Sequence, residues 1–327
     1  MAAPRTDSQS FWPEQRVLVT GGAGFLGSFV VDKLRSVGAK DISVPRSKDV
    51  DLRHAPAIEE LLARTKPTLI IHLAAVCGGI GANQVNGARF FYDNAIMGIQ
   101  LIELARQAGV QKFVQVGTVC AYPGETPVPF KEKNLWNGYP EPTNAPYGLA
   151  KKMLLVQAQA YRDHYQFDAI YLLPANLYGP RDHFDLETSH VIPALIRKID
   201  EAKRAGNPSF EVWGSGKASR EFLYAGDAAE GIVLAAEKYN GRDPVNLGTG
   251  SSVTIRELVH LLCKLMDYHG TVHWNKKRPD GQMRRRLDVS RARKAFGFQA
   301  KTRLEDGLRR TIAWYQEHQT SCEKTIA

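Results

Sequence analysis

The stretch Thr20-Gly21-Gly22-Ala23-Gly24-Phe25-Leu26-Gly27 follows a short β-forming run, 16–20, and opens a helical pattern that continues to residue 37. A strand-to-helix turn that binds a phosphate needs one glycine for the tight turn. It needs a second where the backbone approaches the ligand and a third where the helix packs on the sheet. Gly21, Gly24 and Gly27 meet these needs. The amides of a helix N-terminus attract anions, so the stretch predicts a site for the pyrophosphate of a dinucleotide.

Outward from this turn, strands and helices alternate along the first half of the chain. We expect strands at 16–20, 41–44, 68–73, 112–116 and 169–173, and helices at 25–37, 57–64, 88–107 and 146–164. The alternation predicts an α/β fold, a Rossmann-type doubly wound parallel sheet with a smaller C-terminal α/β substrate-binding region. The expected parts are a flexible tail (1–13), an NAD(P)-binding domain (14–178, with a return segment near 225–250) and a substrate-binding region (179–224 and 251–320).

Composition excludes several classes of protein. No apolar run is long enough to cross a bilayer, and the polar residues 1–9 lack the apolar segment of a secretory signal. The four cysteines show no paired spacing, which favours a reducing compartment, so we expect a cytoplasmic protein without a metal site. The net charge of +9 is dispersed and no nucleic-acid motif accompanies it. The charge therefore favours small anionic ligands, with a solvated basic surface as the plainer alternative.

The end of the second expected strand bears on the choice between NAD and NADP. NAD sites usually place Asp or Glu there to bind the ribose hydroxyls, whereas this chain has Arg46, followed by Lys48. A 2′-phosphate would find a charge-assisted partner at this position, so we predict NADP, with NAD as the alternative. The other expected cofactor contacts are Phe25 and Leu26 in the turn, Asp51 and Leu52 at the adenine edge, and Ala74 and Ala75 after the third strand.

Tyr147 and Lys151 lie four residues apart on an expected helix, so they share one face. A nearby ammonium lowers the pKa of a phenol, and Tyr147 is therefore expected to pass a proton to a carbonyl oxygen while hydride arrives at its carbon. Thr118, just after the fourth strand, is expected to hold the same oxygen. Tyr147 and Lys151 are also expected to contact the cofactor.

Several longer motifs accompany these residues, and with them the chain resembles the GDP-L-fucose synthase family of the extended short-chain dehydrogenase/reductase superfamily. The resemblance covers residues 15–316. It rests on motifs such as Cys120-Ala121-Tyr122-Pro123, Glu141-Pro142-Thr143-Asn144-Ala145-Pro146-Tyr147, Ser189-His190-Val191-Ile192-Pro193, Val212-Trp213-Gly214-Ser215-Gly216 and Pro279-Asp280-Gly281.

The resemblance implies a two-stage reaction on GDP-4-keto-6-deoxy-D-mannose. Cys120 would remove protons at C3 and C5, beside the C4 ketone, and His190 would return protons on the other face. NADPH would then reduce C4, with Tyr147 as proton donor. Without the resemblance, Cys120 fits a small buried apolar residue and His190 a structural histidine equally well. The sugar-nucleotide contacts that the resemblance implies are Asn176, Val191, Lys198, Trp213, Arg220 and Arg285.

The chain also departs from the family pattern. The family usually has Gly-His-x-Gly-Met-Val-Gly in its glycine-rich turn, whereas the turn of this chain is more usual in epimerases that retain NAD. A redox-neutral NDP-sugar epimerase with tightly bound NAD is therefore an alternative. A non-catalytic NADP-binding regulator is a weaker alternative, because Tyr147 and Lys151 are both present. The resemblance further implies a homodimer formed through the helices at 88–107 and 146–164.

Overall fold

The computed structural model describes residues 11–278 and 280–324, and its centre is a six-stranded sheet. The strand order is β10-β5-β4-β3-β1-β2, and all neighbours are parallel. These strands are β1 (Arg16–Thr20), β2 (Asp41–Ser43), β3 (Leu69–His72), β4 (Lys112–Val116), β5 (Asp168–Pro174) and β10 (Val245–Leu247). The structure confirms the predicted Rossmann-like α/β fold.

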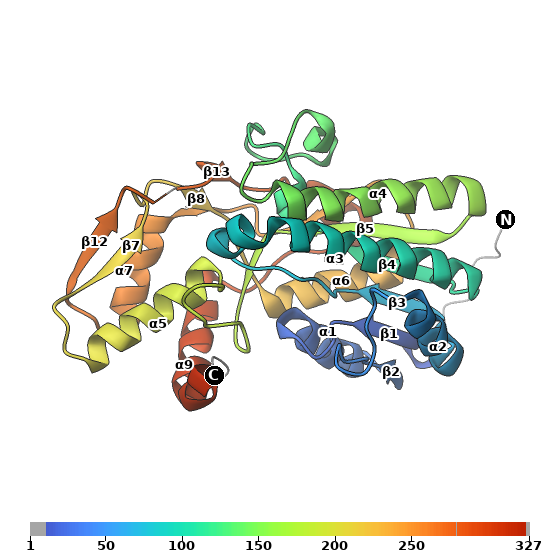
Figure 1. Ribbon diagram of the computed structural model, residues 1–327, viewed down its shortest axis with the longest axis horizontal. Helices are drawn as coiled ribbons and strands as arrows, with labels where there is room; N and C mark the ends of the chain where they lie inside the picture. Colours follow the sequence, from blue (N-terminus) through green and yellow to red (C-terminus); the bar gives the residue numbers. More distant parts are fainter. Residues whose placement is uncertain (1–10, 279, 325–327) are drawn as a thin grey trace.

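Helices cover both faces of this sheet (Figure 1). Helices α2 (Ala55–Thr65), α3 (Ile80–Gln107) and α4 (Ala145–Tyr165) lie on one face, and α1 (Phe25–Ser36) and α6 (Ala225–Lys238) lie on the other. The central strands are mostly apolar because both of their faces are covered, as in β3, where all four residues, Leu69–His72, are buried. The carboxyl ends of these parallel strands meet at one edge of the sheet, where α/β proteins bind their ligands.

The last strand of the sheet comes from far along the chain. The segment 225–250, expected to return to the first domain, contains α6 and β10, and Val245 of β10 pairs with Leu172 of β5. Helix α6 packs on α1 beneath the sheet, and α8 (Ser290–Phe296) packs on α6. The sheet of the nucleotide-binding half is therefore completed only after the chain has formed the first part of the second lobe, from α5 to β8.

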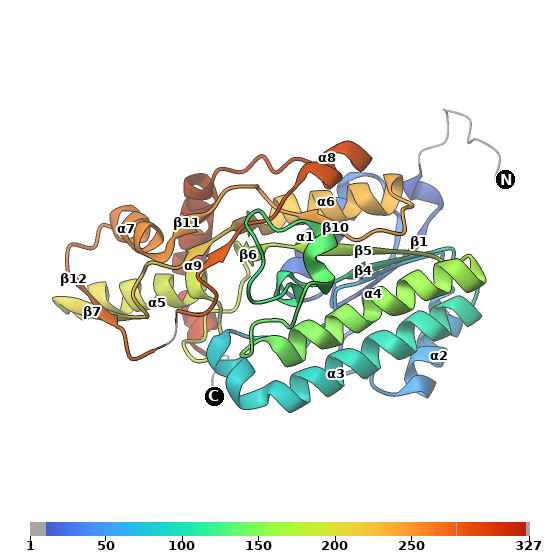
Figure 2. The same ribbon diagram turned by 90° about the horizontal axis from the view of Figure 1, so that it is seen from above.

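The second lobe lies beside the carboxyl edge of the sheet (Figure 2). Its own apolar core is formed by residues such as Ile196, Leu258 and Leu308, from three different helices. The elements of this lobe are α5 (Val191–Arg204), β7 (Ser209–Trp213), β8 (Ser219–Arg220), β11 (Val253–Thr254), α7 (Ile255–Leu265), β12 (Thr271–Asn275), β13 (Arg284–Arg285) and α9 (Leu304–Lys324). Two short parallel strands, β6 (Asn176–Tyr178) and β9 (Phe222–Tyr224), connect it to the first half.

The amino-terminal prediction needs a correction. Residues 1–10 of the predicted tail lie outside the described residues, as does Pro279 of the Pro279-Asp280-Gly281 motif. Residues 11–13 are not a flexible tail. Trp12 begins a 3-10 helix, η1 (Trp12–Glu14), is buried in the core, and donates a 3.2 Å hydrogen bond from Nε1 to Oε2 of Glu237 on α6. The burial of the indole ring overrides the polar character of the residues around it.

Helix α3 starts at Ile80 instead of residue 88, and its axis is interrupted at Asn86, which has non-helical backbone angles. The Asn83 side chain donates to the carbonyl oxygens of Gly78 and Gly79 at 2.8 and 3.0 Å, which supports the first turn. The glycines and polar residues of this turn conceal the helix in the sequence. No helix among the described residues is long and apolar enough to span a membrane.

Candidate active site

A cavity of about 1090 Å³ opens between the carboxyl edge of the sheet and the second lobe. Every residue that the sequence predicts for catalysis, for the cofactor or for the substrate lines it. The residues reach the cavity from the ends of β1 to β5, from the first turns of α4, and from α5, β7, β8 and β13. The fold therefore brings the predicted site together from segments spread along the whole chain.

The glycine-rich turn forms one end of this cavity. Gly21 has a φ of 71°, and a Cβ atom there would lie 2.9 Å from the backbone nitrogen of Ala74. A Cβ atom on Gly27 would lie 2.0 Å from the carbonyl oxygen of Gly21, so only glycine lets α1 start this close to β1. Gly24 caps α1 without a side-chain hydrogen bond, and Phe25 and Leu26 in the first turn also line the cavity, as does Ala75 beside Ala74.

Two basic side chains, Arg46 and Lys48, line the far end of the cavity, after β2. Arg46 and Lys48 are exposed, and no carboxylate among the described residues forms an ion pair with either. The neighbouring Leu52 is buried and anchors the loop. This end of the cavity therefore offers two uncompensated positive charges.

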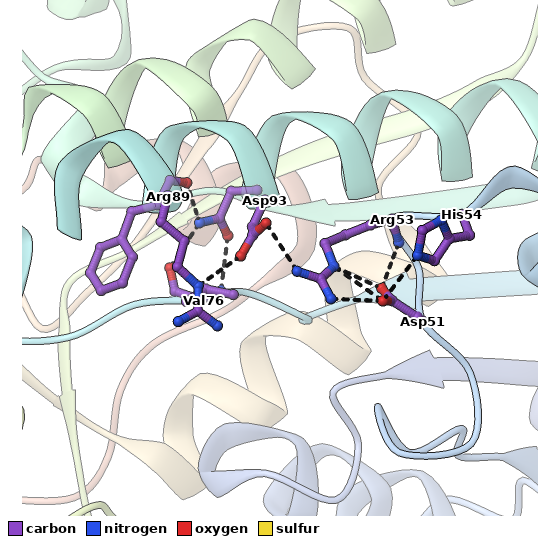
Figure 3. A network of polar contacts seen from close by, with 8 residues as sticks. Asp51, Arg53, His54, Val76, Arg89 and Asp93 are labelled. Carbon is purple, nitrogen blue, oxygen red and sulfur yellow. Dashed lines mark hydrogen bonds and ion pairs between the residues drawn. The ribbon is translucent and has the colours of Figure 1, made fainter.

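A network of ion pairs ties the same loop to α3 (Figure 3). Arg53 donates from Nη2 to Oδ2 of Asp51 at 2.7 Å and from Nη1 to Oδ1 of Asp93 at 3.4 Å. Arg89 donates from Nε to the other oxygen of Asp93 at 3.2 Å. The hydrogen bonds from Arg53 lower the pKa of Asp51 to about 2, so Asp51 stays ionised at neutral pH. No motif in the sequence marks Arg53 or Asp93, because only the fold brings the loop and α3 together.

At the centre of the cavity, Thr118 follows β4 and caps the 3-10 helix η2 (Val119–Ala121), accepting a 3.2 Å hydrogen bond from the backbone nitrogen of Cys120. Tyr147 lies in the first turn of α4, and its interaction with the Thr118 side chain acts to lower the pKa of the phenol. Lys151, one turn later, is buried and donates from Nζ to the carbonyl oxygen of Ala74 at 3.3 Å. The Tyr147 phenol, the Thr118 hydroxyl, the Lys151 amine and the Cys120 thiol therefore belong to residues that line one cavity.

The pKa values at this centre differ from expectation. Burial lowers the pKa of Lys151 to about 8, although the Cys77 thiol acts in the opposite direction. Burial also raises the pKa of Tyr147 well above its usual range, and Cys77 and Cys120 add to this shift. The pKa of Tyr147 is therefore raised, whereas the neighbouring ammonium was expected to lower it. Desolvation of the phenolate is the largest cause of the shift, and Tyr147 holds its proton firmly.

His190 enters the cavity from the second lobe, at the N-terminal cap of α5. Its loop is tied to the start of α3, because the backbone nitrogen of Gly79 donates to the carbonyl oxygen of Thr188 at 2.8 Å. Burial, with a contribution from His183, lowers the pKa of His190 below its usual value. A lowered pKa makes the imidazolium form a stronger acid.

A second thiol, Cys77, lines the same cavity and was not predicted. Burial raises its pKa, and it interacts electrostatically with Lys151, Cys120 and Asp182. Asp182 is itself buried, its Oδ2 has no hydrogen-bond partner, and burial raises its pKa to about 7. No motif or spacing in the sequence marks Cys77 or Asp182, so only the structure reveals that they are near the centre.

The residues expected to hold the substrate line the end of the cavity formed by the second lobe, and Val191 begins α5 there. The Trp213 ring is partly exposed, with Arg278 4.5 Å and Lys198 5.8 Å from its centroid. Asn176 donates to the carbonyl oxygen of Glu221 at 2.8 Å and so holds the neighbouring strand. This end of the cavity thus combines an accessible aromatic ring with several cations.

Two arginines separate this end from the centre. Arg220 donates to the carbonyl oxygens of Ser219 and Asp280, and burial together with Arg285 lowers its pKa to about 10. Arg285 was expected to contact the sugar nucleotide. In the structure its Nη1 lies 3.7 Å from the Cys120 sulfur.

The comparisons with known proteins agree on one family. Residues 17–248 match the NAD dependent epimerase/dehydratase family. The chain is 37% identical to the probable GDP-L-fucose synthase 1 of Oryza sativa subsp. japonica over 310 residues, 94% of each chain. It is 38% identical to the GDP-L-fucose synthase of Sinorhizobium fredii over 294 residues, 90% of this chain and 93% of the relative. A solved GDP-L-fucose synthetase from Naegleria fowleri, bound to NADP, superposes with a TM-score of 0.84 at 28% identity, covering 93% of this chain and 95% of the other.

Proposed function

Because the chain belongs to the NAD dependent epimerase/dehydratase family, we propose that it is an NADPH-dependent epimerase and reductase that converts GDP-4-keto-6-deoxy-D-mannose to GDP-L-fucose. One observation carries the proposal. Thr118, Tyr147 and Lys151, which suit carbonyl reduction, share a cavity with Cys120 and His190, which suit proton transfer at carbon. A plain reductase needs only the first set.

In the first stage, Cys120 and His190 act as base and acid. The ketone at C4 acidifies the hydrogens on C3 and C5, so the Cys120 thiolate removes each proton in turn, and His190 returns a proton to the opposite face. Cys120 belongs to the first lobe and His190 to the second, which supports the assignment of the base and the acid to opposite faces of the sugar. Thr118 and Tyr147 hold the oxygen on which negative charge develops in the enolate, as preorganised hydrogen-bond donors do in other enzymes.

In the second stage, Tyr147 donates a proton to the C4 oxygen. NADPH supplies the hydride that arrives at C4. Because the pKa of Tyr147 is raised, the phenol carries its proton at neutral pH and is ready to donate it. Lys151, with a pKa of about 8, is mostly protonated at pH 7 and stabilises the phenolate that remains.

The residues of the cavity fit NADP. The turn at Gly21 and Gly27 has no room for a Cβ atom, and it leads into the N-terminus of α1, which suits a pyrophosphate. Arg46 and Lys48 supply the positive charge that a 2′-phosphate requires, and the neighbour from Naegleria fowleri has NADP bound. The basic loop and this neighbour both favour NADP over NAD.

Two further expectations concern the state of the protein in the cell. Apolar side chains are exposed along the paired helices α3 and α4, including Tyr92, Ile99 and Val156, and we expect a homodimer to bury them. The described cysteines Cys77, Cys120 and Cys263 are all free thiols, which fits a reducing, cytoplasmic location.

The test is turnover of GDP-4-keto-6-deoxy-D-mannose by the purified protein, with NADPH oxidation followed optically and the product sugar identified by NMR. Formation of GDP-L-fucose with one NADPH oxidised per sugar is the expected result. A sugar reduced at C4 but not inverted at C3 and C5 would remove the epimerase half of the proposal. No NADPH oxidation in the presence of the substrate would overturn the proposal as a whole.

A further inference from the structure

The second lobe reaches across the cavity to the thiol of Cys120 through a single buried arginine. Arg285 on β13 is 7% exposed, and its Nη1 lies 3.7 Å from Cys120 Sγ, within hydrogen-bonding distance for sulfur. Its Nε donates to Oε1 of Gln282 at 3.1 Å. Gln282 in turn donates from Nε2 to the carbonyl oxygens of Gly124 at 2.7 Å and Pro123 at 3.3 Å.

These contacts form a closed ring. The chain continues from Cys120 directly to Pro123 and Gly124. The carbonyl oxygens of these two residues accept hydrogen bonds from the Gln282 side chain, which in turn accepts one from Arg285. The guanidinium group is therefore fixed relative to the sulfur by the loop that carries the sulfur. Strand β13 is fixed as well, because Arg285 pairs with Arg220 of β8 in parallel register. The arrangement needs no substrate to form it.

Within the described part of the chain, Arg285 has the Cys120 sulfur, and not a carboxylate, as the neighbour that can carry a negative charge. No carboxylate among residues 11–278 and 280–324 makes an ion pair with Arg285, although many other arginines of the protein have one. The neighbouring Arg220 is a second cation, and it also interacts electrostatically with Cys120. A guanidinium group stays protonated throughout the accessible pH range, so Arg285 cannot itself accept a proton from a substrate. It can stabilise a negative charge on the sulfur beside it.

We propose that Arg285 is a positioning residue that stabilises the thiolate of Cys120 and so prepares the base of the epimerisation stage. The inference rests on the proposed function, in which Cys120 removes the protons at C3 and C5. A thiolate next to an arginine forms more readily than one in neutral surroundings, and only the thiolate is a base or nucleophile. This role differs from the expected one, in which Arg285 contacts the sugar nucleotide.

Alkylation of the ligand-free protein by iodoacetamide at pH 7.5 tests this role without requiring turnover. Cys120 would be followed by mass spectrometry of its peptide, with Cys263 on α7 as the internal reference. In Arg285→Gln we expect the Cys120 alkylation rate to fall about tenfold, because the charge-assisted hydrogen bond is lost. In Arg285→Lys we expect part of the rate to return, since the charge is kept while the geometry changes.

Arg284→Gln is the matched control, because Arg284 precedes Arg285 on the same strand and its side chain is exposed. It removes the same charge and should leave the Cys120 rate unchanged. NADP+ binding by each variant would establish that it is folded. An unchanged Cys120 rate in Arg285→Gln, or an equal fall in Arg284→Gln, would overturn the inference. Because alkylation needs no sugar, a failure of the proposed turnover would be recognised separately.

Discussion

At the scale of single residues, the cavity contains two free thiols, and only one of them is placed to be the proposed base. The Cys120 sulfur lies 3.7 Å from Nη1 of Arg285, whereas Cys77 lies after β3, is exposed in the cavity, and has a pKa raised mainly by desolvation of its thiol. A thiol with a raised pKa is a poor source of thiolate at neutral pH. The structure therefore assigns the two cysteines different chemical characters.

This difference gives the first prediction. Cys120→Ser should abolish the incorporation of solvent deuterium at C3 and C5 of GDP-4-keto-6-deoxy-D-mannose, with a loss of at least about 100-fold, because a serine hydroxyl is a much weaker acid–base catalyst at this position. The measurement is NMR of the sugar after incubation in D2O without NADPH. Cys263→Ser is the control. Persistent exchange in Cys120→Ser, together with its loss in Cys77→Val, would assign the base to Cys77 instead.

The buried Lys151 predicts how stability depends on pH. Its pKa is about 8 in the folded protein and 10.5 is the ordinary value, so above pH 8 the unfolded chain binds more protons than the folded one. The contribution of Lys151 to the free energy of unfolding therefore rises with pH between about 8 and 10.5, by up to about 3 kcal/mol. This contribution is lowest below pH 8.

Lys151→Met should remove this dependence. The variant should be more stable than the parent at pH 7, and the difference should shrink as the pH approaches 10.5. Urea denaturation of the ligand-free proteins at pH 7, 8.5 and 10 measures the free energies of unfolding. A difference that stays constant over this range would mean that the pKa of Lys151 is not lowered.

At the scale of secondary-structure elements, the close approach of α4 to η2 sets the position of the proposed catalytic residues. A Cβ atom on Gly148 would lie 2.4 Å from the carbonyl oxygen of Cys120, and this oxygen belongs to backbone that cannot rotate away. Gly148 follows Tyr147 directly, so the contact fixes the phenol and the thiol relative to each other. The missing side chain is therefore a requirement of the site as well as of the fold.

Gly148→Ala should accordingly damage both stability and activity. The added methyl group must push η2 away from α4, which costs about 1–3 kcal/mol and moves Cys120 and Thr118. We expect a lower midpoint in thermal unfolding and a kcat reduced at least about tenfold. The control is Gly124→Ala, where a Cβ atom would have no neighbour closer than 3.6 Å. Equal effects of the two substitutions would show that the contact at Gly148 is unimportant.

The elements also explain what the sequence could predict. Strands such as β3 and β4 are short apolar runs between helices with clear periodicity, and the structure places them within one or two residues of the predicted positions. The start of α3 at Ile80 and the helices α5 and α6 were not predicted. The first turn of α3 depends on a side-chain hydrogen bond from Asn83, which local propensity does not reveal. The contact of Arg285 with Cys120 joins residues 165 positions apart and depends on the packing of two lobes.

At the scale of the whole molecule, the outer faces of α3 and α4 form the surface proposed to join two copies. Both helices lie side by side along one side of the protein (Figure 2), and Tyr92 and Val156 are 62% and 50% exposed. Two helices from each copy would bury these side chains against one another. An exposed apolar surface of this kind is otherwise unfavourable in water.

Val156→Glu should therefore separate the two copies, because an unpaired carboxylate would be buried in the interface. Light scattering after size-exclusion chromatography should give about twice the chain mass for the parent and about the chain mass for the variant. Val85→Glu is the control. Val85 is also an exposed apolar residue of α3, but it precedes the interruption at Asn86. A parent protein that runs at the chain mass at all concentrations would contradict the homodimer.

The position of β10 at the edge of the sheet has a consequence for the synthesis of the protein. Strand β5 is complete at Pro174, but its partner begins only at Val245, after the first part of the second lobe (α5 to β8) and helix α6. A ribosome adds about 5–20 residues per second, so the edge of β5 is unpaired for several seconds while the intervening segment is made. During this interval Leu172 and Leu173 offer a nascent chain the edge on which sheets aggregate. Chaperones that bind extended apolar segments would act on this protein before the ribosome reaches β10.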